Sequence, residues 1–261
     1  AQNVDTRHIQ TSAGRMGTYF LEAGAVRRPS RIVYDRANSV FAMTPAVTYD
    51  WDAILEGADW LHLSGITPAV GADPSAAAKN AVQSARRHGV RISFDGNYRQ
   101  ALWSAWGGDG PDVLRDILNH ADTAFINERD VALILGENFD TREQGIKRAF
   151  SAFPALSTIA CTARAQDSVS NQTLTGELHT RDDACISRPH DMTNIVDRIG
   201  GGDAFAAGVL HGLIGGFKPQ RIIEFATAAS TIKHSISGDW NLTNLAEVEE
   251  AMNESGLDVR R

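Results

Sequence analysis

The chain has 261 residues, 43% of them hydrophobic, and its formal net charge at pH 7 is −7. This length suits one α/β domain with a small appendage, and the hydrophobic content is enough for a sizeable core. The acidic balance argues against a general nucleic-acid or anionic-membrane surface, and no apolar run reaches the length that spans a bilayer.

The cysteines and histidines show no metal-binding pattern. The two cysteines, Cys161 and Cys185, lack the spacing of a metal site, and no two of the eight histidines form an H-x-x-x-H pair. Two thiols in a reducing cytosol are therefore expected, instead of a disulfide or a zinc site. The first residues do not form a signal peptide. We therefore expect a cytoplasmic protein.

Residues 1–45 differ in pattern from the rest of the chain. Two short strands are predicted over 18–22 and 31–36, with turn residues and charges between them. Because no helix of useful length separates these strands, they are expected to pair in antiparallel fashion.

From residue 46 onward, buried strands and helices alternate. Strands are expected over 59–65, 90–95, 123–126 and 157–161, and helices over 47–55, 74–88, 112–120, 128–135, 141–153, 219–234 and 245–252. Residues 165–190 are polar and weakly patterned, which indicates an edge hairpin. The alternation predicts an α/β fold with a doubly wound, mainly parallel sheet between helices. Ligands bind beyond the carboxyl ends of such strands, where the loops at 64–67, 96–99, 127–130 and 200–203 would open.

The most informative stretch is residues 197–205, in which Gly200, Gly201 and Gly202 run directly into Asp203. The residues that follow are apolar almost all round, which predicts a buried helix. The glycines therefore form a tight loop at a helix N-terminus. That end presents free N–H groups and the positive end of the helix dipole, and without Cβ atoms an anion can approach closely.

An anion hole beside a carboxylate is what phosphoryl transfer to an alcohol requires. The N–H groups of Gly200, Gly201 and Gly202 would stabilise charge on the transferred group, and Asp203 would orient the attacking hydroxyl and accept its proton. The alternative is a glycine-rich turn in which Asp203 is an ordinary helix cap. A Walker P-loop or a G-x-G-x-x-G fingerprint is excluded, because both need a different spacing and position.

The longer pattern favours the catalytic interpretation. Asp197 lies three residues before the glycines, and Asp-Ala-Phe follows them, so the stretch resembles the signature D-x-x-G-A-G-D-x-F of the ribokinase-like (PfkB) sugar kinases, with Gly201 in place of alanine. Within that family, nearly the whole chain resembles the 2-keto-3-deoxygluconate kinases. The matching segments are residues 17–20, 34–36, 64–66, 95–99, 102–103 and 237–239.

The resemblance implies an ATP- and Mg2+-dependent kinase with a ribokinase-like fold. It implies that residues 1–45 are part of a β-sheet lid over the sugar and that 46–261 form the α/β catalytic core. The family's N-terminal strand, with its glycine- and asparagine-bearing sugar site, has no counterpart, so the chain is expected to start late. The open edges of lid strands often pair between subunits, which favours a homodimer through the lid.

The resemblance also suggests residues for the nucleotide site. The family often has K/T-x-G-x-x-G there, whereas this chain reads TARAQD over 162–167. Thr162 and Arg164 are interpreted as nucleotide-binding, with Arg164 contacting a phosphate where glycine normally leaves space. Asn127 is either a plain helix cap or a residue near Mg2+ and phosphate. Asp130 is a candidate for holding the metal through water, although the family more often has glutamate at this position.

Five residues are candidates for binding the substrate. Tyr34 and Arg36 lie two apart, so on a strand they share a face and suit a sugar acid; the alternative is an exposed strand face. Arg99 follows a strand at the edge where ligands bind, which suits a substrate contact; the alternative is a solvated or ion-paired side chain. The family match makes Asp239 a hydroxyl-binding group, and Tyr19 is a lid residue that binds substrate or only packs.

The two guanidinium groups favour an acidic substrate. Arg36 on the lid and Arg99 on a core loop should face each other across the sugar, and two cations are best explained by an anion between them. We therefore expect an acidic keto sugar, 2-keto-3-deoxygluconate above all, phosphorylated on its terminal hydroxyl. The alternatives are a ribokinase, fructokinase or nucleoside kinase, and a non-catalytic sugar-acid sensor on the same scaffold. A nicotinamide oxidoreductase is disfavoured, because no glycine fingerprint follows the first strand.

Overall fold

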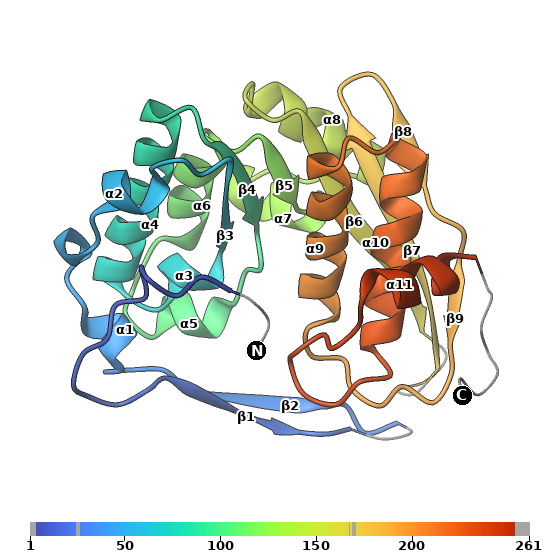
Figure 1. Ribbon diagram of the computed structural model, residues 1–261, viewed down its shortest axis with the longest axis horizontal. Helices are drawn as coiled ribbons and strands as arrows, with labels where there is room; N and C mark the ends of the chain where they lie inside the picture. The colour runs from blue at the N-terminus through green and yellow to red at the C-terminus, as the bar shows by residue number, and fades with distance from the viewer. Residues whose placement is uncertain (1–3, 25–26, 167, 169–170, 254–261) are drawn as a thin grey trace. The chain divides into compact units, whose positions relative to one another are not determined.

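The computed structural model describes residues 4–24, 27–166, 168 and 171–253 (Figure 1). The chain divides into two compact units, the first formed by Ala1–Phe20 and Ile32–Ser157, and the second by Leu21–Arg31 and Thr158–Arg261. Each unit has its own buried side chains, and the first two strands contribute residues to both units.

The two N-terminal strands form a small sheet of their own. Strand β1 (Thr18–Glu22) pairs with β2 (Arg31–Asp35), and neither joins the strands that follow. This confirms that residues 18–36 lie outside the larger sheet. Most side chains of the pair are exposed, including the apolar Phe20, and the role of this sheet as a lid stays a prediction.

The first unit contains three parallel strands. They are β3 (Trp60–Ser64), β4 (Arg91–Asp95) and β5 (Thr123–Phe125), with β4 between the other two. The longest helix of the unit, α4 (Ala72–Arg87), packs on β3 and β4. The other helical segments are α1 (Val40–Met43), a 3-10 turn (Ala46–Thr48), α2 (Trp51–Leu55), α3 (Ile66–Ala69), α5 (Gln100–Ser104), α6 (Gly110–Leu118), α7 (Glu128–Leu135) and α8 (Arg142–Ala152).

Local capping explains most of the helix boundaries. Asn127 and Thr141 each form a reciprocal capping box at the start of α7 and α8. The helix expected over 47–55 is interrupted, because Asp50 accepts the N–H of Ala53 and starts α2 at Trp51. The sequence pattern did not show that Asp50 caps a helix instead of lying inside one.

The second unit is built on an antiparallel hairpin that is longer than the sequence indicated. Strand β6 (Thr158–Gln166) pairs with β7 (Gln172–Thr180) over nine residue pairs, and β7 also pairs with β8 (Ala184–Ile186) and β9 (His190–Met192). Along β7, buried side chains alternate with partly exposed ones, beginning with the buried Gln172, because one face of the strand packs inward. The helices are α9 (Gly201–Ile214), α10 (Pro219–Lys233) and α11 (Leu245–Met252), and α10 packs on α9 and β7.

Apolar side chains fill the interior of each unit. In the first, Ile92 and Phe94 of β4 and Trp103 of α5 are almost fully buried, and in the second Ile159 and Ile223 are. Among the helices of the described residues, none has the length and apolar character needed to cross a membrane.

Candidate functional site

The N-terminus of α9 presents backbone donors, as the glycine stretch predicted. Gly200 precedes the helix with φ of 77°, a left-handed conformation that favours glycine, and gives no side-chain cap. In the described part of the chain, the N–H groups of Gly202 and Asp203 donate to no protein acceptor, and that of Gly201 reaches only the carbonyl of Arg198 at 3.4 Å. This end of the helix is therefore suited to bind an anion.

The three glycines differ in what surrounds them. A Cβ atom at Gly200 would lie 2.7 Å from the carbonyl oxygen of Asp239, and one at Gly201 would lie 2.6 Å from Cε1 of His234. A Cβ at Gly202 would meet nothing within 4 Å. Packing therefore requires the first two glycines, whereas Gly202 faces open space. The His234 ring also explains why glycine stands here in place of the alanine of the family pattern.

Asp203 is exposed in the first turn of α9. Within the described residues, its carboxylate forms no hydrogen bond, so it is available to a ligand. Asp197, by contrast, is used structurally: its two carboxylate oxygens accept N–H groups from Ile199 and Gly238, both at 2.9 Å. Asp197 therefore fixes the glycine turn and ties it to the loop that contains Asp239.

A buried lysine holds the same loop from the other side. The Lys233 side chain is fully buried at the end of α10, and its ammonium donates to the carbonyl oxygens of Ile236 at 2.9 Å and Gly238 at 2.7 Å. Bonds from a charged donor are stronger than neutral ones. Lys233 therefore fixes the backbone on either side of residue 237, directly before the exposed Asp239.

His234 lies under the glycines and is 2% exposed. Its Nδ1 lies 2.7 Å from the carbonyl oxygen of Ser230, so we assign the proton to Nδ1. Burial lowers the pKa of His234, and the positive charges of Arg164, Arg198 and Lys233 lower it further, although the bond to Ser230 opposes them. The imidazole is therefore neutral at pH 7.

Three cations act on the histidine that lies under the start of α9. Arg164, Arg198 and Lys233 all act electrostatically on His234, which contacts Gly201. Together with the helix dipole, they bring positive charge to this end of the second unit, beside the carboxylates of Asp197, Asp203 and Asp239. The sequence reasoning had included Arg164 but missed Arg198, Lys233 and His234. The basic residue inside the glycine motif was the one signal that pointed to such a cluster.

In the first unit, the loops that follow the parallel strands meet at one edge, as predicted. The Gly65 N–H donates to the carbonyl of Asp95 at 2.7 Å, and Nδ2 of Asn97 donates to the Ser64 hydroxyl at 3.1 Å. A Cβ atom on Gly65 would lie 2.0 Å from the carbonyl oxygen of Gly96, so this close approach requires glycine. The Ser64–Gly65 and Asp95–Asn97 loops therefore support each other.

Arg99 and Asn127 lie on the loops of this edge, and Asp130 lies in the first turn of α7. Arg99 is exposed, and its guanidinium donates to its neighbour's carbonyl oxygen, that of Tyr98, at 2.9 Å. Asn127 and Asp130 form the capping box of α7, with the Asn127 N–H donating to Asp130 at 2.9 Å. Burial raises the pKa of Asp130, whereas the bond from Asn127 and the charge of Arg99 lower it. The cap is thus present, and a role near metal or phosphate stays a proposal.

The remaining candidates lie on strands or, for Arg36, directly after one. The Arg36 guanidinium stacks over the Tyr34 ring at 5.0 Å from its centroid, which confirms that the two share a face, and both are partly buried. Tyr19 is the partly buried residue of β1. Thr162 and Arg164 lie on one face of β6, since they are two residues apart. Residue 167, the last of the predicted nucleotide segment, lies outside the described residues.

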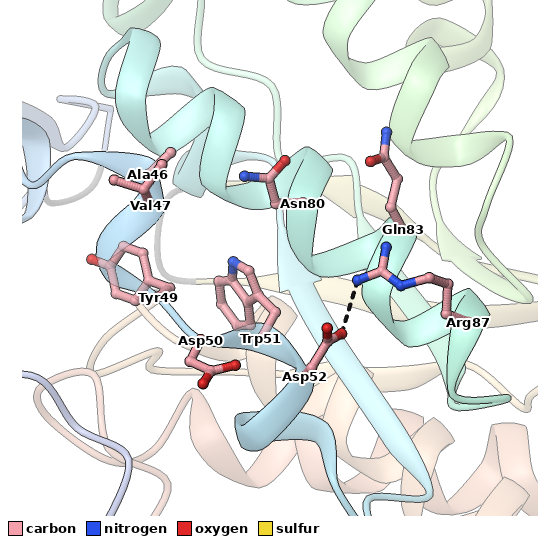
Figure 2. A pocket seen from close by; sticks show the side chains of 9 residues that line it. All are labelled: Ala46, Val47, Tyr49, Asp50, Trp51, Asp52, Asn80, Gln83 and Arg87. Carbon is pink, nitrogen blue, oxygen red and sulfur yellow. Dashed lines mark hydrogen bonds and ion pairs between the residues drawn. The ribbon is translucent and has the colours of Figure 1, made fainter.

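A hollow of about 250 Å³ lies elsewhere in the first unit, between the region of α2 and one face of α4 (Figure 2). Tyr49 and Trp51 stack at 5.5 Å on one side, and Arg87 pairs with Asp52 at 2.8 Å on the other. None of the residues that the sequence predicted for catalysis or binding lines it. This hollow is therefore not part of the candidate site.

The chain is similar to known carbohydrate kinases along almost its whole length. Residues 1–243 match the pfkB family of carbohydrate kinases. A 2-dehydro-3-deoxygalactonokinase from Haloferax volcanii is 28% identical over 94% of this chain and 73% of its own length. A 2-dehydro-3-deoxygluconokinase from Thermoproteus tenax is 26% identical, over 91% of this chain and 68% of its own length.

A solved structure gives the same result for the fold. The crystal structure of 2-dehydro-3-deoxygluconokinase from Thermotoga maritima matches with a TM-score of 0.88 and 33% identity, covering 96% of this chain and 77% of that one. The ribokinase-like α/β fold predicted from the sequence, a mixed and mostly parallel sheet flanked by helices, is thereby confirmed.

Proposed function

Because this chain belongs to the pfkB family of carbohydrate kinases, we propose that it transfers the terminal phosphoryl group of ATP to the terminal hydroxyl of an acidic keto sugar. It is a phosphotransferase with an alcohol group as acceptor. The observation that carries the proposal is the start of α9. Among the described residues, N–H groups and the Asp203 carboxylate have no protein partner there, and three cations act on His234 beneath it.

In the proposed mechanism, the N–H groups of Gly201, Gly202 and Asp203 stabilise the negative charge that spreads over the transferred phosphoryl group. Arg164 contributes a further positive charge from β6, consistent with its influence on His234. The Asp203 carboxylate orients the sugar hydroxyl and accepts its proton as the new P–O bond forms. The bond between the β- and γ-phosphates of ATP breaks, and ADP leaves.

ATP and magnesium are typical of this family, and the second unit suits the nucleotide phosphates. Mg2+ keeps several waters and is held largely by phosphate oxygens. Asp130 suits a contact through water, because one of its oxygens already accepts the Asn127 N–H. Bound Mg2+ would neutralise phosphate charge. Thr162 on β6 remains the candidate for contacting the nucleotide.

For the sugar, we propose that Tyr34, Arg36 and Arg99 recognise the carboxylate. A guanidinium group pairs with a carboxylate in a two-point geometry that a neutral sugar does not offer. The ring of Tyr34 already orients the Arg36 guanidinium. Tyr19 packs beside the sugar, and Asp239 binds a hydroxyl.

The preferred substrate is 2-keto-3-deoxygluconate, with 2-keto-3-deoxygalactonate as the second candidate. The names of the Thermotoga maritima and Thermoproteus tenax proteins favour the first, and that of the Haloferax volcanii protein favours the second. The two acids differ in the configuration of one carbon, so both satisfy the argument from Arg36 and Arg99.

The experiment is an ADP-release assay with both acids, ribose, fructose and adenosine. The proposal predicts the highest kcat/KM for one of the two acids. Preference for a neutral sugar would overturn the substrate assignment, and no ADP release with any of them would favour a non-catalytic sugar-acid sensor.

The same assay tests the two arginines. Arg36→Ala and Arg99→Ala should each lower kcat/KM for the acid by about 10–100-fold, the cost of a lost charge-assisted hydrogen bond, with less effect on ATP. Arg87→Ala is the matched control, since Arg87 is exposed on α4 and is not placed in the site. An equal loss in all three variants would contradict the proposed role.

We also propose that residues 1–45, of which 1–3 and 25–26 lie outside the described residues, act as a lid and as a dimer contact. The exposed apolar side chains Phe20, Ile32 and Val33 on β1 and β2 support this proposal. Phe20→Ser should therefore shift the protein toward the monomer in sedimentation, and an unchanged mass would argue against pairing through this sheet.

A further inference from the structure

Three side chains that can ligate a metal lie on one face of the antiparallel strands β6 and β7, and the kinase proposal does not use them. Cys161 lies directly opposite Glu177 in the antiparallel pairing of β6 and β7, and His179 follows Glu177 by two residues. All three side chains therefore point to the same face of the sheet. Figure 1 shows these strands side by side in the second unit.

The donor atoms of these side chains are already close together. The Cys161 sulfur, a Glu177 oxygen and a ring nitrogen of His179 all lie within 4.8 Å of one another. Nε2 of His179 is 3.0 Å from Oε2 of Glu177. Ligand atoms around a tetrahedral zinc ion lie about 3.5 Å apart, so small side-chain rotations complete the geometry.

The surroundings suit a bound ion more than a solvated ion pair. Cys161 is 7% exposed, and the side chains of His179 and Glu177 are 14% and 15% exposed. Because the His179 and Glu177 side chains keep this exposed fraction, the donor atoms are not sealed from solvent. Glutamate and a cysteine thiolate together supply two negative charges, which balance a divalent cation.

We propose that Cys161, Glu177 and His179 bind a zinc ion, with water as the fourth ligand. Thiolate and imidazole favour Zn2+ over Mg2+, which prefers oxygen ligands and octahedral geometry. Because the ligands come from two strands, no spacing motif in the sequence shows them. The proposal therefore departs from the sequence-based expectation of two thiols without a zinc site. The ion would clamp β6 to β7, next to Thr162.

The test uses metal-stripped full-length protein titrated with Co2+ and then Zn2+. One equivalent of Co2+ should give a thiolate charge-transfer band, which Zn2+ should abolish and excess Mg2+ should not. Cys161→Ser should lose the band, whereas Cys185→Ser should keep it, because Cys185 pairs with Leu178 on the opposite face. His179→Gln should weaken Zn2+ binding by at least about 100-fold in competition with a chromophoric chelator. This is more than the loss expected when only a hydrogen-bond partner of a metal ligand is changed.

Each alternative result contradicts the site. Absence of the band in the wild-type protein, its persistence in Cys161→Ser, or its loss in Cys185→Ser would each overturn the assignment. The His179 side chain is partly exposed, so His179→Gln disturbs the packing less than Cys161→Ser does. If the circular dichroism of His179→Gln matches that of the wild type, misfolding does not explain its loss of Zn2+ binding. Unchanged Zn2+ affinity in this variant would leave only a local histidine–glutamate ion pair.

Discussion

The contact between Gly201 and His234 predicts that alanine at position 201, as in the family pattern, is harmful in this chain. An alanine Cβ would lie 2.6 Å from Cε1 and 3.2 Å from Nε2 of the buried ring. Gly201 does not have a positive φ, so the backbone itself tolerates alanine. The cost of Gly201→Ala is therefore steric and depends on His234.

The magnitude follows from two opposing effects. Overpacking a well-filled site costs about 1–3 kcal/mol. Replacing glycine by alanine in a helix raises the free energy of unfolding by at most about 1 kcal/mol, and by less in the first turn. Gly201→Ala should therefore lower the free energy of unfolding by about 1–2 kcal/mol, or the Tm by roughly 2–8 °C at this chain length. The displaced N–H groups should also lower kcat more than they raise KM.

A double-mutant cycle isolates the contact. Denaturant unfolding and ADP release are measured for the wild type, Gly201→Ala, His234→Ala and the double variant. Alanine at position 201 should cost at least about 1 kcal/mol less when His234 is absent, because the ring no longer blocks the Cβ. Strictly additive losses would refute the reasoning.

Three further predictions concern the same two units. Lys233→Met should lower the free energy of unfolding by about 2–4 kcal/mol in urea titrations, because two carbonyls lose a buried charged donor; the exposed Lys218→Met should change it little, and equal effects would contradict this. Asn127→Ala and Asn244→Ala each remove a capping box and should each cost about 1 kcal/mol, but only Asn127→Ala should raise the KM for ATP. The pKa of His234 is lowered in the folded state, so below about pH 6.5 the unfolded chain binds more protons than the folded chain. The free energy of unfolding should therefore decrease as the pH is lowered, by up to ~1.4 kcal/mol per pH unit. A His234→Gln variant with the same dependence on acidic pH would refute the shift.

Local patterns predicted the local structure well. The strands before residue 36, the parallel strands at residues 60–64, 91–95 and 123–125, and the α11 helix follow from alternation, apolar runs and caps. The glycine stretch predicted the helix start and the backbone N–H groups that have no acceptor among the described residues, because three glycines before an apolar helix leave few other structures.

Features that depend on tertiary contacts were not visible in the sequence. Lys233 and His234 lie at the end of an ordinary amphipathic helix in the sequence. Only the packing of α10 on α9 brings Lys233 against Gly200 and His234 against Gly201. The length of the β6–β7 hairpin was underestimated because its second strand is polar on alternate residues and buried on the others. In the same way, only the pairing register brings Cys161 beside Glu177.

The central claim is that Asp203 is the base of a sugar-acid kinase. The most direct measurement compares kcat for ADP release by the wild type and Asp203→Asn, with 2-keto-3-deoxygluconate and saturating Mg2+-ATP. The account predicts that kcat falls by about 10²–10⁴-fold, while calorimetric ATP affinity and circular dichroism stay near the wild-type values, since the carboxylate is exposed and unpaired among the described residues. A variant that retained near-normal turnover would contradict the claim.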